Sequence, residues 1–170
     1  MTYFFSKKVF FLKGLMIVTE RLHDFTINNV FYLEPIKNTI IDNSNFIRII
    51  YSNNLCTFNG VYIYIEFKDV LLQINNNKVK YSIKPKNNME IITLLKSLEN
   101  DLLDNISINK RKVYKLQEQL QNGVVKIINN NYTLCNETNY NNYILKISGI
   151  WESGDEYGLT YKFIDIYETF

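Results

Sequence analysis

Apolar and polar residues alternate along several short stretches of the chain, a pattern that predicts β-strands. In residues 61–68 every odd position is apolar, whereas the even positions hold two tyrosines, a glutamate and a lysine. A period of two places these sets on opposite faces of a half-buried strand. Strands at 70–74 and 79–83 would complete a three-stranded meander that ends before Pro85. Shorter apolar runs predict further strands at 3–5, 9–18, 30–33, 46–51, 124–128 and 132–135.

Between residues 89 and 106 the spacing of apolar residues changes to that of a helix. From Met89 onward they recur three and four positions apart, which gives one apolar stripe along a long amphipathic helix. We expect this stripe to cover a sheet or barrel rather than to bind a partner. One or two more helical turns are predicted at 116–121, where Asn122 and Gly123 provide a stop signal.

The last two predicted strands, 143–152 and 157–167, form a hairpin around the polar turn 153–156. Leu145 and Ile147 share one phase of the first strand and are expected to face the core. Trp151 has the same phase, so two roles stay open for it: a core residue, or a platform on which a nucleic-acid base stacks.

The same hairpin is expected to place two lysines side by side. If Glu152 pairs with Glu156, Lys146 lies directly opposite Lys162 on the outer face. Like charges across a strand pair repel each other, and a bound phosphate would relieve the repulsion. The alternative is that a nearby carboxylate, Glu66 or Glu152, screens the two lysines.

Many short strands with one long helix between two strand groups favour a mainly β (α+β) fold. The expected architecture is a single domain over 1–170, an OB-fold-like β-barrel with extra strands and one long amphipathic helix at about 89–106. Hydrophobic residues make up 46% of the chain and charged residues 21%, as in globular proteins. No apolar stretch approaches the roughly 20 residues that span a bilayer. We therefore expect an intracellular protein that is neither secreted nor in a membrane.

Catalytic and metal-binding residues are scarce. The chain has one histidine, His23, and two cysteines, Cys56 and Cys135, which are too far apart for a metal motif. Its 6 glycines are scattered and form no phosphate-binding loop. We expect no cofactor and no catalysis, although a magnesium site built from carboxylates alone stays open.

Aromatic and basic residues fit single-stranded nucleic acid better. Such ligands need aromatic platforms, each worth roughly 1–3 kcal/mol per stacked base, and cations along the phosphates. Tyr62 and Tyr64 project from the polar face of their strand, although the strand preference of tyrosine alone would also explain them. The densest basic cluster consists of Lys110, Arg111, Lys112 and Lys115, and Lys126 lies further along. A solvated charged surface is the alternative for this cluster.

Two segments of the last third of the chain resemble a known family. Residues 114–127 precede the runs Leu-Lys-Ile-Ser-Gly-Ile-Trp-Glu at 145–152 and Tyr-Gly-Leu-Thr-Tyr-Lys-Phe at 157–163. Together they resemble a C-terminal signature of viral single-stranded-DNA-binding proteins, such as the baculovirus DNA-binding protein and, more distantly, a phage counterpart. The resemblance implies an oligonucleotide-binding barrel that coats single strands during viral DNA replication or recombination, as an oligomer.

The sequence therefore predicts a non-catalytic single-stranded-DNA-binding protein of a large DNA virus, with RNA as an open alternative ligand. Homo-oligomers, viral replication proteins as partners, and the host nucleus or a viral replication compartment are part of this expectation. The predicted binding residues are Lys146, Lys162, Trp151, Tyr157, Tyr62, Tyr64, Arg111, Lys112, Lys115 and Lys126. One rival is an OB-like module for protein–protein interaction or oligomerisation without DNA binding. Another is a metal-dependent nuclease that uses only carboxylates.

Overall fold

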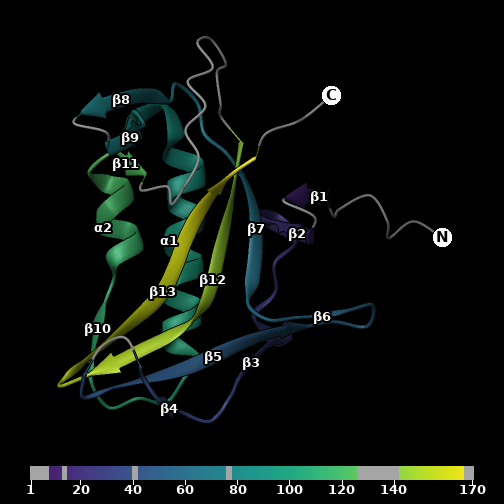
Figure 1. Ribbon diagram of the computed structural model, residues 1–170, viewed down its shortest axis with the longest axis vertical. Helices are drawn as coiled ribbons and strands as arrows, with labels where there is room; N and C mark the ends of the chain where they lie inside the picture. The colour runs from purple at the N-terminus through teal and green to yellow at the C-terminus, as the bar shows by residue number, and fades with distance from the viewer. Residues whose placement is uncertain (1–7, 13–14, 40–41, 76–77, 126–141, 167–170) are drawn as a thin grey trace.

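One curved sheet and two helices make up most of the protein (Figure 1). The structure is a computed structural model that describes residues 8–12, 15–39, 42–75, 78–125 and 142–166. The predicted strands at 3–5 and 132–135, and most of the one at 124–128, lie outside the described residues. No helix in the described part of the chain is long and apolar enough to cross a membrane.

The main sheet has ten strands. Its principal path runs, in order, through β1 (Lys8–Leu12), β2 (Leu15–Arg21), β7 (Val61–Glu66), β12 (Asn142–Ser153), β13 (Glu156–Asp165) and β10 (Arg111–Val113). The long strand β5 (Ser44–Ser52) pairs with the second half of β12. It also pairs with three short strands, β3 (Val30–Tyr32), β4 (Ile36–Lys37) and β6 (Thr57–Phe58).

The sheet does not close into a barrel, so a closed barrel is wrong as a prediction, and the OB-like architecture is not confirmed. The β1 and β10 strands lie at opposite ends of the strand order and do not pair with each other. Helices α1 (Met89–Asp104) and α2 (Lys115–Gln121) pack on one face of the sheet. The fold is therefore mainly β with one long helix, as expected, but open.

The predicted meander at 61–83 is also only partly correct. Strands β8 (Leu71–Asn75) and β9 (Lys78–Ser82) form a hairpin, but their sheet contains β11 (Val124–Val125) rather than β7. Positive φ at Asp69, +53°, helps the chain turn away after β7. The remaining regular elements are the 3₁₀ turns η1 (Leu22–Asp24), η2 (Ile27–Asn29) and η3 (Pro85–Asn88).

The apolar stripe of α1 covers the sheet, as its periodicity predicts. Five of its side chains are buried in the core, together with two from α2: Ile92, Leu95, Leu98, Leu102, Leu103, Leu116 and Leu120. They meet the inward residues of β5, β7, β12 and β13. Fully burying each such side chain contributes about 1.5–3 kcal/mol, so this contact accounts for much of the stability.

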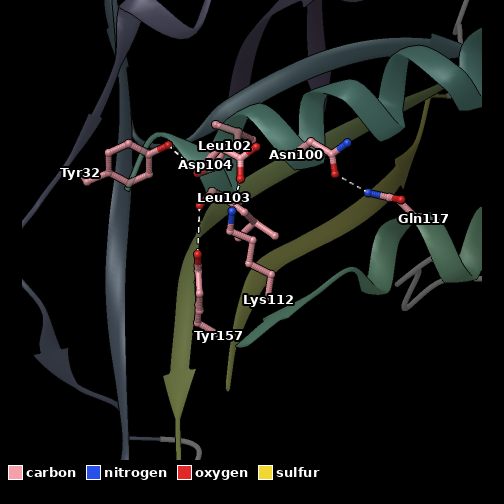
Figure 2. Close-up of polar contacts among 8 residues, drawn as sticks. All are labelled: Tyr32, Asn100, Leu102, Leu103, Asp104, Lys112, Gln117 and Tyr157. Carbon is pink, nitrogen blue, oxygen red and sulfur yellow. Dashed lines mark hydrogen bonds and ion pairs between the residues drawn. The ribbon is translucent and has the colours of Figure 1, made fainter. Parts of the chain in front are cut away.

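Two tyrosines tie the end of α1 to the sheet (Figure 2). The hydroxyl of Tyr32 donates to the carbonyl of Leu102 at 2.8 Å, and that of Tyr157 donates to the carbonyl of Leu103 at 3.1 Å. The last carbonyls of a helix have no partner inside it, so these bonds satisfy groups that would otherwise be left open. Burial raises the pKa of Tyr32 to about 12, which keeps its hydroxyl protonated and able to donate.

A buried carboxylate joins the two helices. Glu99 of α1 accepts hydrogen bonds from the backbone N–H of Leu116 at 3.1 Å and from that of Gln117 at 2.9 Å, at the start of α2. These amides have no partner within α2, and a negative charge is favourable at a helix start. Burial nevertheless raises the pKa of the Glu99 carboxyl above its ordinary value, while the hydrogen bonds oppose the rise.

Glu99 should make stability depend on pH. Because its pKa is higher in the folded state, its stabilising contribution is full below the unfolded pKa and is lost as pH rises through the folded pKa. Glu99→Gln cannot titrate. We expect the wild-type free energy of unfolding, relative to that of Glu99→Gln, to fall as pH rises above about 4.5, the ordinary pKa of a glutamate. Urea unfolding of both proteins measures this, and a pH-independent difference would contradict it.

Candidate nucleic-acid interface

The outer face of the main sheet is the face opposite α1 and α2. Residues paired across neighbouring strands share a face, so the strand register identifies its members. Lys146 of β12 pairs with Tyr62 of β7 on one side and with Lys162 of β13 on the other. These three residues form a row across the outer face, with Lys162 exposed and the other two half-buried.

The Lys146–Lys162 pairing is confirmed, but the pairing from which it was predicted is wrong. Glu156 pairs with Ser153 rather than with Glu152. A register shift between Ile147 and Gly149 leaves Ser148 as an extra residue in β12. This β-bulge changes the register by one, so that Lys146 still meets Lys162.

The same bulge settles the position of Trp151. Beyond Ser148 the phase of β12 is reversed, so Ile150 faces the core and Trp151 lies on the outer face, half-buried. Its indole lies across Gly158, where an added Cβ would stand 3.0 Å from the ring. The interpretation of Trp151 as a core residue is therefore wrong, because the extra residue reverses the alternation on which it rested.

A second row of the outer face contains Trp151 and Phe46 of β5, which pair directly. Between the two rows, Arg48 of β5 pairs with Gly149 and donates to the Asn59 side chain at 3.0 Å. Phe46 and Arg48 were not among the residues predicted for this site. Alternation along 46–51 could have identified them, because it puts Phe46 and Arg48 on the face opposite the buried Ile47 and Ile49.

Three half-buried aromatic rings of this face have a cation nearby. Lys146 Nζ lies 5.0 Å from the ring centroid of Tyr62, and Lys115 Nζ lies 4.6 Å from that of Trp151. The Arg48 guanidinium is 5.9 Å from the centre of the Phe46 ring. Cations near aromatic faces attract the rings, and the same pairs can meet a phosphate and a base together.

No carboxylate neutralises the central lysines within the described part of the chain. Glu152 forms an ion pair with Lys110 at 2.7 Å, and that contact lowers the pKa of the Glu152 carboxyl. Glu66 pairs in register with Asn142, two rows from Lys146 along β7 and β12. The suggested screening of Lys146 and Lys162 by Glu66 or Glu152 is therefore absent from the described contacts.

Three residues predicted for the interface have other surroundings. Tyr157 is 1% exposed and bonds to α1, so the prediction that it stacks on a base is wrong for this fold. Lys112 points to the helix side, where it pairs with Asp104 (Figure 2). Tyr64 lies on the outer face but is covered by Phe10, whose ring stacks on it at 5.8 Å, and by Lys8.

The remaining predicted residues belong to the edge of the site or cannot be placed. Arg111 of β10 is highly exposed and forms an ion pair with Glu156, its partner in register. Lys115 joins the outer face through Trp151. Lys126 lies outside the described residues.

The described residues contain no group of three or more His, Cys, Asp or Glu side chains that could hold a metal ion. No family model, no curated protein and no solved structure matches the chain.

Proposed function

We propose that the outer face binds single-stranded nucleic acid, and single-stranded DNA in particular, without catalysis. The observation that carries the proposal is the row of Tyr62, Lys146 and Lys162. It places two lysines side by side, without a carboxylate partner among the described residues, next to an aromatic ring. A phosphate between the lysines would remove their mutual repulsion.

The second row supplies stacking surfaces. Trp151 and Phe46 lie beyond the bulge, about 15 Å from Lys146 at the usual rise of about 3.3 Å per strand residue. A single strand of nucleic acid laid along β12 would meet the two lysines first and then two large aromatic rings flanked by Lys115 and Arg48. Cations on phosphates and rings on bases give affinity with little sequence preference.

The resemblance of residues 145–163 to viral single-stranded-DNA-binding proteins supports a more specific version of this role. In that version the chain coats single strands during replication or recombination of a large DNA virus, as a homo-oligomer. The aromatic and basic residues of the hairpin that lie on the outer face, Lys146, Trp151 and Lys162, belong to the resembling runs.

Trp151 provides the test, because it is the only tryptophan in the chain. Titration with an oligo-dT strand at low salt should quench its fluorescence as bases approach the ring. Affinity should fall steeply with salt, because each neutralised phosphate contributes about −0.7 to the slope of log K against log salt. Absence of binding at low salt would contradict the proposal, and salt-independent binding would contradict its electrostatic part.

Exposed apolar side chains favour a second candidate, a protein–protein interaction or oligomerisation module. Phe31 and Ile36 are each 53% exposed and share the outer face, because they pair in register with Ile50 and Phe46 of β5, and Leu33, 47% exposed, lies between them in the chain. Apolar clusters of this kind often mark protein interfaces. This candidate predicts an oligomer by light scattering that persists at high salt, together with no affinity for oligo-dT.

A further inference from the structure

A cleft of about 430 Å³ lies beside the outer face, where β2 stops pairing with β7. The two strands pair only at Glu20–Ile63 and Arg21–Tyr64, after which the chain enters η1. The cleft continues along β7 toward the start of α1. Its volume lies within the range of about 300–1,000 Å³ that is typical of small-molecule sites.

The wall between β7 and α1 is held in place by Asn88. This side chain is 4% exposed and accepts from the Lys68 backbone N–H at 2.7 Å. It also donates to the carbonyls of Lys68 and Lys84 at 2.9 and 3.0 Å. Three hydrogen bonds of one buried amide fix the end of β7 against the start of α1, so this wall of the cleft is formed before any ligand arrives.

The cleft combines separate cationic and apolar surfaces. Arg21 and Lys68 supply positive charge, as does Lys8, whose ammonium lies over the Tyr64 ring. Leu22, Ile91 and Leu94 supply an apolar wall. Two carboxylates, Glu66 and Glu90, also line it. No ion pair joins these cations to these carboxylates in the described structure, so the guanidinium and the ammonium are available to a ligand.

We propose that this cleft is a second binding site, which takes a nucleoside monophosphate group. Arg21 and Lys68 would hold the phosphate, because a guanidinium and an ammonium bind phosphate oxygens directly. The base would lie against the apolar wall, and Glu66 or Glu90 would accept from sugar hydroxyls or base N–H groups. The group comes from one of two sources, a free nucleotide or the phosphorylated end of a strand.

Isothermal titration calorimetry with thymidine 5′-monophosphate tests the site. Thymidine and inorganic phosphate, the two halves of this nucleotide, are titrated separately for comparison. We expect the nucleotide to bind at least tenfold more tightly than either half. Arg21→Gln and Lys68→Gln should each weaken its binding about tenfold, whereas Lys96→Gln, an exposed change on α1, should leave it unchanged. Lys146→Glu/Lys162→Glu should also leave it unchanged, which separates this site from the outer face.

Linear oligo-dT with and without a 5′-phosphate distinguishes the two sources. If the ligand is a strand end, the phosphorylated oligonucleotide binds more tightly to the wild type, and Arg21→Gln removes the difference. If the ligand is a free nucleotide, both oligonucleotides bind equally and the monophosphate still binds. The proposal is overturned if the monophosphate does not bind and the 5′-phosphate has no effect, or if both variants bind the monophosphate as the wild type does.

Discussion

Lys146→Glu/Lys162→Glu is expected to weaken binding of an oligo-dT strand roughly 100-fold at low salt, about 2.7 kcal/mol. The two lysines face each other across β12 and β13 without a carboxylate partner among the described residues. Glutamates at both positions would replace attraction for a phosphate by repulsion. The negative slope of log K against log salt should also become shallower by about 0.7, because the phosphate held between the two lysines is no longer neutralised. Fluorescence anisotropy of a labelled strand over a salt series measures both effects.

Lys86→Glu/Lys96→Glu is the matched control. It changes the net charge by the same amount, but both lysines are exposed on η3 and α1, away from the outer face. We expect it to lower affinity only a few-fold, through the general field of the protein. Equal losses in the two double variants would show that the row of Tyr62, Lys146 and Lys162 is not the binding site.

Gly149→Ala is expected to lower the free energy of unfolding by about 2–4 kcal/mol. A Cβ at this position would lie 2.3 Å from the Ile47 carbonyl oxygen and 2.6 Å from the Phe46 ring. The ring can rotate away, but the carbonyl belongs to the backbone of β5, so β5 and β12 would have to separate. The change should also move Phe46 and weaken oligo-dT binding.

Urea unfolding, followed by circular dichroism, measures the stability loss. Gly154→Ala is the comparison, because nothing lies within 4 Å of its added Cβ and only its φ of +52° is unfavourable. That conformation costs about 1–2 kcal/mol for a residue with a side chain. A loss at Gly149 no larger than the loss at Gly154 would show that β5 and β12 tolerate the extra carbon.

Local periodicity was sufficient to predict the elements whose faces have clearly different surroundings. The alternation at 61–68 predicts β7, and the stripe from Met89 predicts α1, because both elements bury one face only. Strand pairing between distant segments was not predictable in the same way. Nothing in residues 70–83 indicates that β8 and β9 leave β7 and pair with β11. The barrel was inferred from the number of strands, and that number does not determine closure.

In the candidate site, too, local periodicity predicted some residues correctly and could not place others. Tyr62, Lys146 and Lys162 were predicted because each follows the alternation of its own strand. The role of Trp151 stayed open between core and outer face, because its phase matched the core residues and the extra residue Ser148, which reverses that phase, leaves no clear signal in the local pattern. The role of Tyr157 depends on the carbonyl of Leu103, 54 residues away, which no local pattern reveals.

The position of β12 in the sheet has a consequence for synthesis on the ribosome. Its first half pairs with β7 and its second half with β5, so the hydrogen-bonded ladders of these two earlier strands form only once residues 142–153 are available. At about 5–20 residues per second, several seconds pass between the synthesis of β7 and that of β12. During this interval the β5 and β7 edges are exposed, and such edges are prone to aggregation. The nascent chain should therefore need chaperone protection until the hairpin emerges.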